Sequence, residues 1–91
     1  MVVEIYVIIV YDVGEERVNR IHKFLKAYLT WTQNSVFEGK ITKATLAQIK
    51  TGIKSIIKKE VDSIKIFKIK GEQWMNIEIM GVEKNKFQNI I

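Results

Sequence analysis

The chain opens with a stretch that is apolar on both alternating faces. Residues 2–11, VVEIYVIIVY, interrupt their apolar run only at Glu4. A strand with one face in water alternates apolar and polar residues, whereas a strand covered on both faces reads as a continuous apolar run. The pattern therefore predicts a strand that is buried on both sides.

Two later segments have the spacing of amphipathic helices. In residues 15–29 and 43–59 apolar side chains recur three and four positions apart, which is the period of one helix face. We expect Thr42 to cap the second helix. Gly52 lies inside that helix, where glycine costs about 1 kcal/mol relative to alanine, so packing must stabilise it.

The remaining segments are typical of strands. Residues 29–41 are β-prone around a turn at Gln33 and Asn34, which predicts a hairpin. Residues 63–70 and 74–81 predict two more strands joined by a turn. This order, β-α-β-β-α-β with an additional C-terminal strand, is that of an α+β ferredoxin-like plait. The 91 residues have room for one such domain, residues 1–91.

The doubly apolar first strand has a consequence for assembly. In the predicted plait both helices cover the same face of the sheet, so something else must cover the other face. A second copy of the chain would do so, together with the apolar tail that ends in Phe87, Ile90 and Ile91. The pattern thus predicts a homodimer packed sheet to sheet.

Composition narrows the classes of chemistry. The formal net charge of +5 indicates an anionic partner such as nucleic acid. The absence of cysteine excludes disulfides, thiolate zinc sites and a cysteine nucleophile. The N-terminus lacks the features of a signal peptide, and no apolar run approaches the roughly 20 residues of a membrane span. We therefore expect a cytoplasmic protein that does not contact a membrane.

Asp12, which follows the first strand, has two interpretations. Asp12 and Glu15 have the spacing of a capping box that would open the first helix. A carboxylate at the end of a rigid strand can instead serve as a metal ligand or an acid–base group. Mg²⁺ is usually held by one or two carboxylates with waters and phosphates. A two-fold axis beside Asp12 would supply a second carboxylate, so chemistry at this position depends on the dimer.

Several other candidates are better explained by structure than by chemistry. His22 is the only histidine and lies in the apolar stripe of the first helix, where we expect it to pack. Ser35 has no evident base beside it, so a turn or strand position is favoured over a nucleophile. The aromatic residues of the strands are expected in the core rather than stacked on bases, namely Trp31, Phe37, Phe67 and Trp74.

The first helix also has a basic side. It carries Arg17 and Arg20, which are the only arginines, together with Lys23. Solvated charge is the default interpretation of such a face. Phosphate contact is the alternative, and it gains support because Arg17 lies at the same end of the helix as Asp12.

Three motifs carry a resemblance to a known family. They are Tyr11-Asp12-Val13 at the end of the first strand, QNSVFEG at residues 33–39 and DSIKIF at residues 62–67. In this order and spacing they resemble the CRISPR-associated Cas2 family, the small ferredoxin-fold companion of the CRISPR integrase. The likeness extends over residues 2–80.

The resemblance implies a site at a dimer axis. It implies a sheet-to-sheet homodimer in which the C-terminal strand lies against the partner. Asp12 would lie opposite its mate as the metal ligand and catalytic residue, with one Mg²⁺ shared by the two subunits. Tyr11, Ser35 and Phe37 would form its surroundings.

The resemblance also implies nucleic acid and a protein as partners. Arg17, Arg20 and Lys23 would contact the backbone of duplex DNA or of single-stranded RNA, and the dimer would bridge CRISPR integrase dimers during spacer acquisition. Metal-dependent endonuclease activity on RNA or DNA is the implied chemistry. We favour the architectural role as the biological function and keep cleavage as a biochemical property. The alternative outside the family is a ferredoxin-fold RNA-binding protein or a toxin-type ribonuclease.

Overall fold

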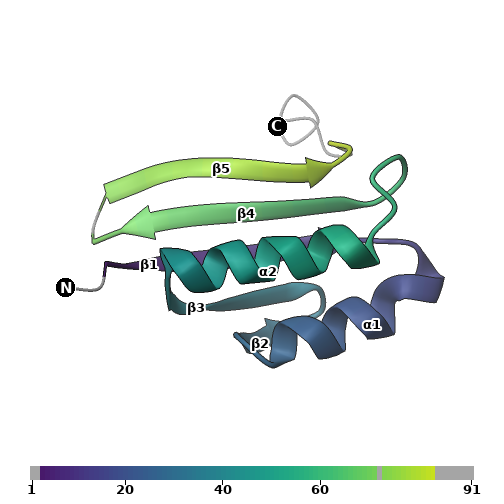
Figure 1. The fold of residues 1–91 in the computed structure, drawn as a ribbon, viewed down its shortest axis with the longest axis horizontal. Coiled ribbons are helices and arrows are strands. Elements are labelled where there is room, and N and C mark those ends of the chain that lie inside the picture. Colours follow the sequence, from purple (N-terminus) through teal and green to yellow (C-terminus); the bar gives the residue numbers. More distant parts are fainter. Residues whose placement is uncertain (1–2, 72, 84–91) are drawn as a thin grey trace.

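The computed structural model describes residues 3–71 and 73–83 of the chain (Figure 1). They form five strands and two helices: β1 (Glu4–Asp12), α1 (Glu15–Lys26), β2 (Thr30–Gln33), β3 (Val36–Thr42), α2 (Lys43–Ile56), β4 (Ser63–Lys70) and β5 (Gln73–Gly81). This is the predicted order of elements, with β5 as the additional strand. The apolar tail at Phe87, Ile90 and Ile91 lies outside the described residues.

The strands form one antiparallel sheet in the order β2-β3-β1-β4-β5. β1 occupies the centre and pairs with β3 on one side and β4 on the other. β5 extends the sheet at the β4 edge, and its pairing shifts register between Lys68 and Ile69. The prediction of an α+β ferredoxin-like plait with an added strand is confirmed.

Both helices lie on one face of this sheet, in front of it in Figure 1. The core forms between them and the sheet, and alternate residues of β1 supply its centre: Ile5, Val7, Ile9 and Tyr11. The other β1 residues between them are only partly buried. The prediction that β1 is buried on both sides is confirmed for the helix face, whereas the other face is only partly buried in the single chain and no described element covers it.

Both helices are shorter than the periodicity predicts, and tertiary contacts set their ends. α1 stops at Lys26, and the chain then turns. Leu29, which continues the apolar spacing of the helix in the sequence, is buried beside the sheet. α2 stops at Ile56 because Ile57 is extended, with ψ of 163°. Thr42 caps α2 as predicted, since its side-chain oxygen accepts a hydrogen bond from the backbone N–H of Thr45 at 3.0 Å.

Gly52 lies where the two helices meet. A Cβ atom at this position would collide with the ring of Phe24 on α1. Glycine therefore allows the aromatic ring to pack directly against α2, and this contact accounts for a residue that disfavours helix.

The predicted hairpin is present with its turn one residue later than expected. Asn34 and Ser35 form the turn, and Asn34 adopts a positive φ of 45°. Asparagine tolerates this left-handed conformation better than most residues do. No helix in the described residues is long and apolar enough to span a membrane.

Candidate functional site

Asp12 is the last residue of the central strand β1. It is exposed and stands opposite Ser63, the first residue of β4. Successive side chains of a strand point to opposite faces of the sheet. Since Tyr11 is buried on the helix face, Asp12 projects to the face that the helices leave uncovered.

The capping-box prediction for Asp12 is wrong. The N-cap of α1 is Gly14, and no side chain caps that end of the helix. Asp12 is still paired within the sheet, two residues before the cap, so its carboxylate belongs to the strand end. Glu15 and Glu16 instead place negative charge in the first turn of α1, where it interacts favourably with the helix dipole.

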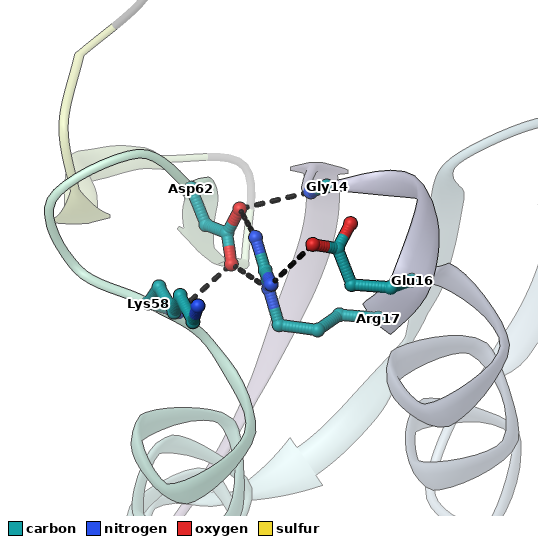
Figure 2. A network of polar contacts seen from close by, with 5 residues as sticks. All are labelled: Gly14, Glu16, Arg17, Lys58 and Asp62. Carbon is teal, nitrogen blue, oxygen red and sulfur yellow. Dashed lines mark hydrogen bonds and ion pairs between the residues drawn. The ribbon is translucent and has the colours of Figure 1, made fainter.

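A different aspartate holds the N-terminal end of α1. The carboxylate of Asp62, just before β4, accepts a hydrogen bond from the backbone N–H of Gly14 at 2.9 Å (Figure 2). It also accepts hydrogen bonds from Arg17, with Nε to Oδ2 at 2.6 Å and Nη2 to Oδ1 at 2.9 Å. A fourth hydrogen bond comes from the backbone N–H of Lys58 at 2.8 Å. We call Asp62, Arg17 and the N–H groups of Gly14 and Lys58 the Asp62 cluster.

The Asp62 cluster is withdrawn from water. The side chain of Asp62 is 0% exposed and that of Arg17 is 10% exposed. Hydrogen bonds from Arg17, aided by those from the two backbone N–H groups, outweigh burial and hold the pKa of Asp62 far below its usual range. Asp62 is therefore ionised at neutral pH, and its charge is balanced inside the fold.

This arrangement corrects the prediction for Arg17. We expected it on the solvent-exposed basic face of the first helix, but its guanidinium is directed inward to Asp62. The physical reason is the buried carboxylate, which needs a bidentate cationic partner. Arg20 and Lys23 do lie exposed on α1. Their role in binding nucleic acid stays a prediction.

The expected surroundings of Asp12 lie mainly on the helix side of the sheet. Tyr11 stacks on Phe37, with ring centroids 6.2 Å apart, and both are buried. Burial raises the pKa of Tyr11. Ser35 lies in the turn beside the strand end, and its carbonyl accepts a hydrogen bond from the Tyr11 backbone N–H at 3.0 Å. Ser35 thus adjoins the strand end through its backbone, while the two aromatic rings support the strand from the core.

His22 packs as predicted. Its ring meets Phe37 and Trp31 edge-on at centroid distances of 5.1 and 5.2 Å. Its Nδ1 atom lies 3.3 Å from the hydroxyl of Tyr11. These contacts account for a partly buried histidine on the apolar side of α1, beside the buried Phe37 and the exposed Trp31.

The uncovered face of the sheet is largely apolar. Strand register places the charged residues Glu38 and Lys65 on it, together with eight partly buried apolar and aromatic side chains: Tyr6, Ile8, Val10, Val36, Phe67, Ile69, Ile77 and Ile79. We call these eight residues the open face. Tyr6 also donates a hydrogen bond from its hydroxyl to Glu38, and this bond raises the pKa of Tyr6. Contiguous apolar surface of this kind marks an interaction site.

The metal-ligating capacity of one chain is limited. Among the described residues there is no group of three or more histidine, cysteine, aspartate or glutamate side chains that could hold a metal ion. Asp12 presents a single exposed carboxylate, whose oxygen atoms suit Mg²⁺. The residues present therefore fit that ion as half of a site, completed by a second carboxylate or by phosphate oxygens.

Sequence reasoning missed the role of Asp62. The residue stood at the start of the DSIKIF motif, but nothing in its neighbourhood indicated a partner, because Arg17 lies 45 positions away. The available signal was an aspartate directly before an apolar strand, where an unpaired carboxylate would be costly.

Comparisons with known proteins agree on one family. A family model described as CRISPR associated protein Cas2 matches residues 5–77. A protein of Methanothermobacter thermautotrophicus named CRISPR-associated endoribonuclease Cas2 is 45% identical over 91 residues, covering 100% of both chains. One of the same name from Thermococcus kodakarensis is 50% identical over 86 residues, 94% of this chain and 99% of that protein.

A solved structure agrees with them. The structure titled "Crystal structure of cas2" superposes with a TM-score of 0.72 and 47% sequence identity. The superposition covers 91% of the present chain and 93% of the chain in the solved structure. Sequence and fold therefore indicate the same family.

Proposed function

The chain belongs to the CRISPR-associated Cas2 family, and we propose that it works as a homodimer that binds nucleic acid and cleaves phosphodiester bonds with Mg²⁺ held between two Asp12 carboxylates. The observation that carries this proposal is the position of Asp12. It projects to the same uncovered, largely apolar side of the sheet as Ile8 and Val10. Family membership also favours a CRISPR role over the alternatives outside the family.

The open face supports the dimer. Burial of apolar surface contributes about 25 cal/mol per Å², and a face of eight partly buried apolar and aromatic residues offers a large area for it. A two-fold dimer joins the same patch on both chains. Since Asp12 stands at the end of the central strand on this face, an axis that crosses the sheet near this end brings the two carboxylates together.

The chemistry follows from what the chain supplies at that axis. Each Asp12 contributes oxygen ligands from a strand end that β4 pairing and core packing hold in place. Mg²⁺ bound there would stabilise negative charge on a phosphate and lower the pKa of a bound water. Arg20 and Lys23 lie exposed on α1 and would hold the backbone through phosphate contacts.

RNA is the first substrate to test. The proteins of Methanothermobacter thermautotrophicus and Thermococcus kodakarensis are both named endoribonucleases, which supports RNA cleavage by this chain. The positive net charge of +5 suits either nucleic acid, because charge recognises phosphates rather than sugars.

The names of the two relatives support cleavage as the first candidate, and the architectural role, which the sequence alone favours, is the second. The same dimer would hold duplex DNA and bridge integrase dimers during spacer acquisition without cleaving anything. Its specific support is the Asp62 cluster: Arg17, one of only two arginines, is committed to the fold rather than to a scissile phosphate. This role requires the dimer and the basic surface but does not require Asp12.

Substitution of Asp12 separates the two functions. We expect Asp12→Ala to abolish Mg²⁺-dependent RNA cleavage while the protein still dimerises and binds RNA. Glu15→Ala, which removes an exposed carboxylate from the neighbouring helix turn, is the matched control and should retain cleavage. Persistent cleavage by Asp12→Ala would rule out Asp12 as the catalytic residue. Unchanged spacer integration by the same variant would assign the biological role to architecture.

A further inference from the structure

The Asp62 cluster lies immediately behind the Asp12 position. Gly14, whose N–H donates to Asp62, follows Asp12 by two residues. Ser63, which follows Asp62 directly, is the register partner of Asp12 across the sheet. One buried carboxylate therefore restrains the Asp12 backbone through the chain that leaves β1 and through the neighbouring strand.

The Asp62 cluster packs closely against the segment that follows Asp12. A Cβ atom at residue 14 would collide with the guanidinium of Arg17, so glycine allows this segment to lie against the ion pair. Lys58 joins the same carboxylate from the end of α2 at 2.8 Å (Figure 2). The Asp62 carboxylate thus binds three parts of the chain: the β1–α1 connection, the first turn of α1 and the segment just after α2.

Asp62 itself does not reach the proposed metal site. Its side chain is fully buried with Arg17 on the helix side of the sheet, whereas Asp12 projects to the open face. Any effect of Asp62 on metal binding must therefore pass through the backbone of residues 12–14 and 63.

We propose that Asp62, together with Arg17, is a positioning residue that fixes the Asp12 carboxylate for a metal shared by two subunits. This inference rests on the proposed function and deepens it. The side chains of a functional site must be held to within about 0.5 Å of their working positions. When a metal lies on a two-fold axis, a shift of Asp12 occurs in both chains, so both ligands of the metal are displaced. A buried, four-fold hydrogen-bonded carboxylate provides that rigidity.

The experiment measures Mg²⁺ affinity by calorimetry on the purified dimer, with kcat and KM for RNA cleavage measured in parallel. We expect Asp62→Asn to weaken Mg²⁺ binding by about 10-fold, the lower end of the effect of losing a group hydrogen-bonded to a metal ligand, because Asp62 reaches Asp12 only through the backbone. We expect kcat to fall with KM for RNA unchanged, because the basic residues that bind RNA are not altered.

Glu78→Gln is the matched control. It breaks another ion-pair cluster, in which Glu78 joins Lys50 at 2.6 Å and Lys68 at 3.1 Å on the helix side of β5. This variant should keep wild-type Mg²⁺ affinity. An equal loss in Glu78→Gln would mean that general loosening of the fold is responsible, and it would overturn the positioning role.

A second variant keeps the test decisive if Asp62→Asn does not fold. The double variant Arg17→Met with Asp62→Leu replaces the ion pair by apolar side chains, a change that buried pairs often tolerate. It should fold and dimerise yet bind Mg²⁺ as weakly as predicted for Asp62→Asn, since no carboxylate then holds the Gly14 N–H.

A folded, dimeric Asp62 variant with wild-type Mg²⁺ affinity and kcat would overturn the inference. Asp12→Ala in the same assays separates that failure from failure of the proposed function. If Asp12→Ala loses Mg²⁺ and the Asp62 variants retain it, only the positioning role is wrong. If Asp12→Ala also retains Mg²⁺, the shared metal site is wrong and the positioning role falls with it.

Discussion

Arg17 and Asp62 form a bidentate ion pair in the interior of the protein, with Nε to Oδ2 at 2.6 Å and Nη2 to Oδ1 at 2.9 Å. The pair joins the start of α1 to the start of β4, two elements that are remote in the chain. It uses one of the two arginines for the fold rather than for nucleic acid. The pair also lies directly behind the strand end that carries Asp12.

Removal of one partner should be costly. We expect Asp62→Ala to lower the free energy of unfolding by about 3 kcal/mol, because it leaves the buried Arg17 charge with only the exposed Glu16, at 3.3 Å, as an ion-pair partner. Arg17→Met with Asp62→Leu should cost less, since neither charge then remains and only the N–H groups of Gly14 and Lys58 lose their acceptor. Urea unfolding followed by circular dichroism measures both. Equal losses in the single and double variants would contradict this explanation.

The same pair should make stability depend on acid. An unfolded aspartate has a pKa near 3.9, and the Arg17 hydrogen bonds hold the pKa of Asp62 well below that in the fold. Below about pH 5 the unfolded chain binds the proton first, so the free energy of unfolding falls as pH falls. Unfolding at pH 7, 4 and 3 should show a shallower decline for Asp62→Asn than for wild type.

A charge-matched variant controls for net charge in that series. Glu60→Gln removes one carboxylate at an exposed position close in the chain. As the pH falls, the free energy of unfolding should decline less in Asp62→Asn than in Glu60→Gln. Indistinguishable declines in these two variants would show that the buried pair is not responsible.

The open face should carry the dimer contact. Ile8→Arg places a charge at the centre of this face, and we expect it to convert the dimer to a monomer at micromolar concentration, as judged by sedimentation. Val61→Arg is the control, because Val61 is 51% exposed in the turn before β4 and outside the open face. A dimer that survives Ile8→Arg unchanged would exclude sheet-to-sheet packing.

Binding of RNA should be electrostatic and should involve α1. On a single strand, the slope of log affinity against log salt becomes shallower by about 0.7 for each phosphate that the protein no longer neutralises. We expect a change of this size for Arg20→Ala and for Lys23→Ala in fluorescence titrations over a salt series. Lys43→Ala, at the exposed start of α2, should leave the slope unchanged. A sequence-selective affinity that does not respond to salt would contradict a basic backbone-binding surface.

The sequence predicts what depends on local periodicity and misses what depends on distant partners. The spacing of apolar residues is enough to locate both helices and all five strands, and the doubly apolar β1 already indicates an uncovered face. The end of α2 could not be placed, because the chain there turns to bring Lys58 to the Asp62 carboxylate. The capping-box spacing of Asp12 and Glu15 misled for a related reason: sheet pairing with Ser63 retains Asp12 in β1.

The sequence likewise predicts one part of the candidate site and misses another. Asp12 could be recognised from its place after the first strand, and the alternation of β1 places its side chain on the open face. The inward direction of Arg17 could not be recognised, because a basic helix face predicts exposure and only a buried carboxylate 45 positions away reverses it.

The separation of the two Asp12 carboxylates in a crystal structure of the Mg²⁺-loaded dimer tests the central proposal most directly. Mg²⁺–oxygen distances of about 2.0 to 2.1 Å require the nearest carboxylate oxygens of the two chains to lie within about 4 Å of each other, with one ion between them. We expect that arrangement. Carboxylates that stand more than about 8 Å apart, each with its own ion or with none, would contradict a single metal shared by two subunits.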